Sequence, residues 1–163
     1  MMPRSNEPGY GRSMDPIALA DQLIAANSYL TLATVDETGD PWSTPVRFAP
    51  DGRRGFVWAS KPGARHSQNI ATNPSVAITI FDSSKAPGEG SAVYAAARAA
   101  EVAEDGRDAA LEVYNARSLE RGLATWTLDK LSGGARHRLF RATVLQLYVL
   151  DDHDERVAVP PAP

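Results

Sequence analysis

The chain of 163 residues contains no cysteine. This absence excludes disulfides, thiolate nucleophiles, iron–sulfur clusters and thiolate metal sites. Only three histidines are present, so few groups are available for an acid–base pair or a histidine-ligated metal. The sequence has no P-loop, no Gly-x-Gly-x-x-Gly fingerprint, no His-Glu-x-x-His helix and no Gly-x-Ser-x-Gly elbow. Hydrolase and metalloenzyme functions are therefore disfavoured, and we expect no metal ligands.

The chain also lacks an apolar run of the roughly 18 residues needed to span a bilayer. It lacks an excess of positive charge, since its formal net charge is −3 at pH 7, and this disfavours nucleic-acid binding. Residues 1–12 are polar and contain no hydrophobic stretch of the kind found in signal peptides. We therefore expect a cytoplasmic protein that binds neither nucleic acid nor a membrane.

The composition is that of an ordinary globular protein. Hydrophobic residues make up 43% of the sequence and charged residues 23%. The length suits one domain. We expect a flexible leader over residues 1–12, a single domain over residues 13–150, and an acidic, proline-rich tail over residues 151–163 that frays.

Hydrophobic periodicity predicts mainly β-structure. A helix is expected over Asp15–Asn27, because Asp15 or Ser13 can cap it and Pro16 suits its first turn. The period then changes to two, and short turns separate the first segments, as in a sandwich or barrel. The predicted strands are Tyr29–Val35, Pro41–Ala49, Phe56–Ser60, Ser75–Asp82, Ser91–Val102 and Leu139–Leu150. Two prolines in Pro41–Ala49 are typical of an edge or bulged strand.

Two further segments favour helices, and one strand has an alternative. Arg65–Thr72 predicts a short helix that ends at Asn73-Pro74, and Asp105–Ser118 predicts a longer one. The alanine run in Ser91–Val102 is also compatible with a helix on propensity alone.

The segment most suggestive of chemistry is the basic turn that leads into the short helix. It reads Ser60-Lys61-Pro62-Gly63-Ala64-Arg65-His66-Ser67-Gln68-Asn69. A helix start offers free backbone N–H donors and the positive end of a dipole, which together favour a phosphate. The Arg65 guanidinium adds a fork of donors, and Lys61 adds a point charge. The alternative is an ordinary basic surface turn.

Four stretches of the chain resemble one known family. They read YLTLATVD from Tyr29, GDPWSTPV from Gly39, FVWAS from Phe56 and RHSQNIATNPSVA from Arg65. Their order and spacing are similar to those of the pyridoxamine 5′-phosphate oxidase-like FMN-binding split barrels, over about residues 28–102. The resemblance implies a mainly β, antiparallel split β-barrel with a few flanking helices.

The resemblance also implies a homodimer with FMN at the subunit interface. The implied cofactor-binding residues are Ser43, Thr44, Pro45 and Val46 on one strand, Trp58, Ala59 and Ser60 on the next, and Lys61, Arg65, His66, Gln68 and Asn69 around the helix. Among these, Arg65 and His66 stand where family members hold the phosphate with a basic pair. His66 replaces a lysine or arginine there and would be only partly charged at neutral pH. Two residues have simpler alternatives, since Asn69 could brace the helix and Trp58 could belong to the core.

The chain departs from the vitamin oxidase itself. Ser43 and Thr44 replace basic residues, Ser91-Ala92 replaces an Arg-Gln pair, and the C-terminal substrate motif is absent. We therefore expect a divergent member that acts as an FMN-dependent oxidoreductase on a small organic substrate. The alternatives are a deazaflavin-dependent reductase of the F-420 type on the same fold, and a non-catalytic protein that binds flavin or haem.

Overall fold

The computed structural model describes residues 14–151 and 154–160 of the chain. The α-helices in these ranges are α1 (Pro16–Ala26), α2 (Arg65–Thr72) and α3 (Arg107–Glu120). The strands are β1 (Tyr29–Val35), β2 (Pro41–Arg47), β3 (Ala49–Asp51), β4 (Gly55–Ser60), β5 (Ser75–Phe81), β6 (Ala92–Glu101), β7 (Arg138–Leu150) and β8 (Arg156–Val159). Two 3₁₀ turns, η1 (Glu104–Gly106) and η2 (Leu128–Lys130), flank α3.

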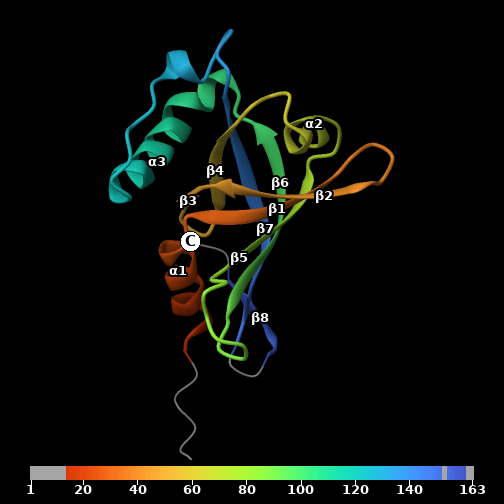
Figure 1. Ribbon diagram of the computed structural model, residues 1–163, viewed down its shortest axis with the longest axis vertical. Helices are drawn as coiled ribbons and strands as arrows, with labels where there is room; N and C mark the ends of the chain where they lie inside the picture. The colour runs from red at the N-terminus through yellow and green to blue at the C-terminus, as the bar shows by residue number, and fades with distance from the viewer. Residues whose placement is uncertain (1–13, 152–153, 161–163) are drawn as a thin grey trace, which may run out of the picture.

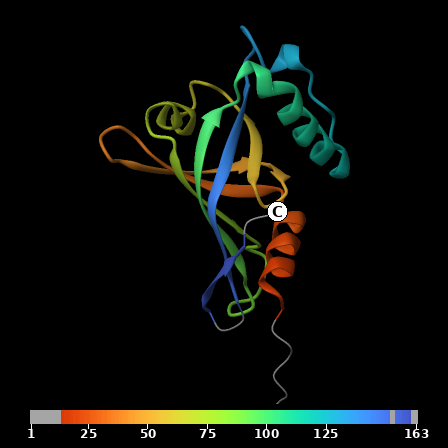
Figure 2. The same cartoon turned by 180° about the vertical axis from the view of Figure 1, so that it is seen from behind.

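The strands form one antiparallel sheet that curls into a half-barrel (Figure 1). Their order across the sheet is β2-β1-β5-β6-β7-β4-β3, and β8 pairs with β7 outside this path. The helices α1 and α3 lie along one flank, and α2 lies on the other flank with the hairpin of β1 and β2 (Figures 1 and 2). The predicted split barrel is confirmed, with eight described strands instead of the six expected.

The alanine-rich segment is the strand β6 and not a helix. Both sides of β6 are occupied, because β5 pairs with one and β7 with the other. A register shift at Ala96/Ala97 marks a bulge in its pairing with β7. Burial alternates along β6, with Ala95, Ala97 and Ala99 facing the core. Tertiary pairing therefore overrides the helical propensity of alanine.

The core fills the concave side of the sheet. Its largest fully buried side chains include Trp58, Phe48, Phe56, Leu30 and Ile78. The rings of Trp58 and Phe140 are stacked at 5.9 Å, so β4 and β7 are joined by packing as well as by pairing. The convex side of β4 forms a second cluster with α3, through Val57, Ala110 and Tyr114 among others.

Two predictions about strands are corrected by the structure. The segment Pro41–Ala49 was expected to be one strand, but it ends at Arg47, and Ala49–Asp51 forms the separate strand β3 against β4. The tail was expected to fray after residue 150, but Arg156–Val159 pairs with β7 as β8. Val159 is 5% exposed and belongs to the main core, which explains why this short segment is ordered in the sheet.

The helix α1 begins as the sequence predicts. The Asp15 carboxylate accepts a hydrogen bond from the Ala18 N–H at 3.3 Å, and Pro16 occupies the first turn. Ala20 and Ile24 are its buried residues. None of the described helices is long and apolar enough to cross a membrane.

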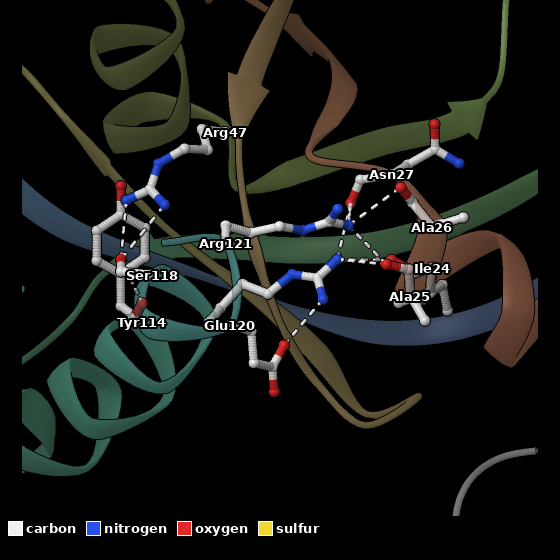
Figure 3. A network of polar contacts seen from close by, with 10 residues as sticks. Ile24, Ala25, Ala26, Asn27, Arg47, Tyr114, Ser118, Glu120 and Arg121 are labelled. Carbon is white, nitrogen blue, oxygen red and sulfur yellow. Dashed lines mark hydrogen bonds and ion pairs between the residues drawn. The ribbon is translucent and has the colours of Figure 1, made fainter. Parts of the chain in front are cut away.

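The far end of α1 is joined to α3 by two arginines (Figure 3). The Nη2 atom of Arg117 donates to the carbonyl oxygens of Ile24, Ala25 and Asn27 at 3.3, 2.7 and 2.9 Å. Arg121 donates to the Ala25 carbonyl at 2.6 Å. Because α1 has no basic residue in its own last turn, these guanidinium groups satisfy the free carbonyls and the negative end of its dipole.

Candidate functional site

The candidate site lies where the turn of the β1–β2 hairpin meets the first turn of α2. Asp36 shapes the hairpin turn with one carboxylate oxygen. Its Oδ1 accepts from the Thr38 N–H at 2.9 Å, the Thr38 hydroxyl at 2.7 Å and the Asp40 N–H at 3.0 Å. The Thr38 hydroxyl, the Asp40 N–H and the other contacts hold the pKa of Asp36 below its usual value. Asp36 is therefore a carboxylate at neutral pH.

The second oxygen of Asp36 faces Arg65, the first residue of α2. The Asp36 Oδ2 and an Arg65 Nη2 are 3.7 Å apart, and the Arg65 guanidinium lies 4.7 Å from the centre of the Trp42 ring. The Arg65 side chain is 46% exposed, so much of its donor fork faces solvent. These contacts fix the guanidinium between helix and hairpin while leaving it accessible.

The first turn of α2 has free backbone donors. Its N-cap residue is Ala64, and no side chain accepts a hydrogen bond from the first N–H groups. A helix start without a side-chain cap retains unpaired N–H donors and a positive dipole end. With Arg65, this turn forms a small cationic site suited to an oxyanion.

His66, the second residue of α2, contacts Ser60 at the end of β4. The His66 Nε2 and the Ser60 Oγ are 2.8 Å apart, and both residues are buried. Burial lowers the pKa of His66 below 6.5, so its ring is neutral at pH 7. Of the two residues, only Arg65 therefore brings a full charge, and the contribution of His66 to a phosphate site stays a prediction.

Asn69 braces α2 against the hairpin. Its amide nitrogen donates to the Thr34 hydroxyl at 3.0 Å, and that hydroxyl donates to the Trp42 carbonyl at 3.4 Å. Asn69 is 4% exposed and Thr34 is 1% exposed. Asn69 therefore connects α2 to the hairpin through a buried hydrogen bond.

The residues predicted on β2 and β4 divide between surface and core. Ser43 and Pro45 are exposed and Thr44 is half-buried, whereas Val46 points into the core. The Trp58 side chain is fully buried, so its contacts are with the core. Ala59 is half-buried beside the second cluster.

Lys61 and Gln68 are exposed at either side of the helix start. Lys61 lies near His137, whose pKa is lowered by burial first and then by Arg136 and Lys61. Gln68 and Pro62 line a cleft of about 450 Å³ between α2 and β6, together with Ala71, Ala100 and Glu101.

Two residues of the site, Asp36 and Trp42, could not be predicted as site residues from the sequence, which indicated only the hairpin that contains them.

Ser67 follows His66 in α2 and is buried. Its hydroxyl has no hydrogen-bond partner within the described residues. Over residues 14–151 and 154–160, no group of three His, Asp or Glu side chains is placed to hold a metal ion. The site therefore offers hydrogen-bond donors and one accessible guanidinium, a set that binds anions.

The chain matches one known protein family over most of its length. The family model described as pyridoxamine 5′-phosphate oxidase matches residues 18–151. The chain belongs to this family. The match to the pyridoxamine 5′-phosphate oxidase family covers every described strand except β8. No curated protein matches the chain significantly.

Solved structures agree with this fold. The haem storage protein HutZ from Vibrio cholerae is 26% identical with a TM-score of 0.67, over 83% of this chain and 95% of that one. A haem-binding protein from Mycobacterium smegmatis is 20% identical with a TM-score of 0.68, over 90% of this chain and 58% of that one. An FAD-binding protein from Mesorhizobium loti is 20% identical with a TM-score of 0.61, over 85% and 95%.

Proposed function

We propose that this chain binds FMN with the cofactor's phosphate at the first turn of α2, and that it is a flavin-dependent oxidoreductase acting on a small organic substrate. The observation that carries the proposal is the uncapped start of α2 with the accessible Arg65 guanidinium beside it. Membership of the pyridoxamine 5′-phosphate oxidase family and the similarity to an FAD-binding protein support a flavin.

The donor chemistry of the turn fits a phosphomonoester. Phosphate oxygens accept hydrogen bonds, and the turn offers backbone N–H groups, the Arg65 fork, and Lys61 as a further charge. The carboxylate in contact with Arg65 is that of Asp36, which belongs to the β1–β2 hairpin and not to this turn. A bound flavin would supply the hydride transfer, and the chain would bind it, orient it and exclude water around it.

Three residues of β2 are proposed to border the flavin ring. Ser43, Thr44 and Pro45 lie on an edge strand, adjacent to the hairpin turn that Asp36 closes. We further propose that a second copy of the chain completes the site, because only one side of such a ring would be covered by β2. Two-fold pairing is the commonest way for a small open barrel to cover its surface.

Haem is the second candidate, favoured by the names of two similar structures. Among the described residues, His66 is engaged with Ser60, so His137 is the ring more available to ligate an iron. His137 is half-buried and lies 5.3 Å from the Trp126 ring in an edge-to-face contact.

The absorbance spectrum of the purified protein separates these possibilities. FMN gives two flavin bands, a deazaflavin gives one band, and haem gives a Soret band. A Soret band that disappears in His137→Ala would replace the FMN proposal with the haem candidate.

A titration with FMN and with riboflavin then tests the phosphate site. Arg65→Ala should lose a charge-assisted contact worth about 1.5–3 kcal/mol, or roughly ten- to a hundredfold in FMN affinity. Riboflavin affinity should not change, because riboflavin has no phosphate. Arg156→Ala is the matched control, since Arg156 also stacks on an aromatic ring, that of Tyr94 at 4.6 Å, but lies on β8. Equal FMN affinity in Arg65→Ala and wild type would contradict the proposal.

A further inference from the structure

Ser60 and His66 form an isolated buried pair beside the proposed phosphate site. Their contact, Nε2 to Oγ, is 2.8 Å, and the residues are 7% and 9% exposed. Within the described part of the chain, neither side chain has another hydrogen-bond partner. Which of the two side chains donates the proton in this hydrogen bond therefore determines whether the Ser60 hydroxyl can donate a hydrogen bond to a ligand or only accept one.

The neutral ring allows only two arrangements of that proton. A neutral imidazole has one nitrogen that donates and one that accepts. Either the His66 Nε2–H donates to the Ser60 oxygen, or the Ser60 O–H donates to an unprotonated Nε2. In the second arrangement the only proton of Ser60 is consumed, and the hydroxyl presents lone pairs alone.

Only the first arrangement is compatible with an anion. Phosphate oxygens accept hydrogen bonds, so Ser60 contributes only if its O–H is free to donate outward. We propose that His66 is a positioning residue, present as the Nε2–H tautomer, which donates to Ser60 and so directs the Ser60 hydroxyl proton toward the phosphate of FMN. This inference rests on the proposed function for its ligand. It assigns His66 a role in orienting a donor, not in supplying charge.

The tautomer is measured in the protein without ligand. Long-range ¹H–¹⁵N NMR of the histidine rings at pH 7.5 should show a protonated Nε2 and an unprotonated Nδ1 for His66, with His66→Gln used to assign the signals. A protonated Nδ1 with an unprotonated Nε2 would overturn the inference.

Affinity measurements test the consequence for ligand binding. Ser60→Ala and His66→Leu should each weaken FMN binding about tenfold, the loss expected for one hydrogen bond to a charged group. The double variant should be no weaker than Ser60→Ala, because His66 acts on the phosphate only through the Ser60 hydroxyl, which Ser60→Ala already lacks. His66→Gln should restore affinity to within about threefold of wild type, since its amide N–H can replace Nε2–H. Circular dichroism and thermal unfolding confirm that each variant is folded.

The outcomes distinguish this inference from the function on which it rests. If wild type binds FMN no more tightly than riboflavin, the phosphate site itself is wrong, and the role of Ser60 fails with it. If wild type prefers FMN but Ser60→Ala, His66→Leu and wild type bind it equally, only the positioning role is wrong. A His66→Gln variant as weak as His66→Leu would also contradict it, because the restored donor would then have no effect.

Discussion

Asp36 uses its two oxygens for different purposes, and this separates its structural role from its electrostatic one. The Oδ1 atom holds the hairpin turn, while Oδ2 faces the Arg65 guanidinium at 3.7 Å. Asp36→Asn retains an oxygen that can accept the turn's hydrogen bonds but removes the charge that competes with a phosphate for Arg65. We expect FMN affinity to rise about two- to fivefold in low salt, the range for exposed charge pairs.

The measurement is the same titration at two ionic strengths. The gain should shrink at high salt, because exposed charges are screened. Riboflavin serves as the control ligand and should bind both proteins equally. A lower FMN affinity in Asp36→Asn, with the fold intact, would show that Asp36 helps Arg65 to bind the phosphate and does not compete with it.

Some residues of the candidate site could be predicted from the sequence. Arg65 and the helix start were identified because a strand, a Gly/Pro turn and a cationic helix N-terminus are contiguous in the chain. The partners Asp36 and Trp42 were missed, since their approach to Arg65 depends on how the hairpin packs against α2. The sequence indicated only that His66 would be partly charged at neutral pH, and the further lowering of its pKa comes from burial, which is a property of the fold.

Among the secondary-structure elements, α1 and α3 are joined by two arginines, of which only Arg117 is buried. The Arg117 side chain is 9% exposed and bonds three carbonyls of the α1 C-terminus, with Glu120 at 3.0 Å as its ion-pair partner. Arg117→Met should lower the free energy of unfolding by about 2–4 kcal/mol, because these carbonyls lose a charged donor within a buried contact. Urea denaturation with an unchanged m-value measures this effect.

Arg121 is the matched comparison, since it donates to the same end of α1 from an exposed position. Arg121→Met should cost less than about 1 kcal/mol, as expected for solvent-exposed contacts. Equal losses in the two variants would indicate that the number of contacts, and not their burial, determines the stability of this junction.

Most elements were predicted within a few residues, because their patterns are local. Arg65–Thr72 was predicted with its observed bounds, and β1 likewise. The strand β8 was missed because four residues, placed between acidic residues and Pro160, carry too little periodicity. Its order depends on pairing with β7 and on burial of Val159, neither of which is visible in the segment itself.

The outward face of β5 and β6 is the surface through which we expect two copies of the molecule to associate. Ala77 and Phe81 are exposed on β5, with Ala96 beside Ala77 on β6, and the Phe81 side chain is 50% exposed. We expect these exposed apolar residues to be covered by a second copy of the chain. Sedimentation equilibrium at tens of micromolar should therefore report a dimer.

A charge placed on this face tests the arrangement. Phe81→Glu should shift the equilibrium toward monomer, because a carboxylate would be buried without a partner. Leu119→Glu is the control, since Leu119 is 65% exposed on α3, on another flank of the barrel, and should leave the dimer intact. A wild-type monomer at these concentrations would contradict the dimer and the shared site with it.

The two prolines of β2 also constrain how copies of the chain can associate. β2 is a terminal strand of the sheet, and Pro41 and Pro45 occupy positions of the same parity along it. A proline tolerated in a paired strand directs its missing donor away from the partner, so the open edge of β2 lacks two of the donors that an added strand would need. The hairpin is thereby protected against edge-to-edge aggregation and fibril growth, although it is exposed. Association of two chains is left to the faces of the sheet, where side chains and not backbone groups determine which partner fits.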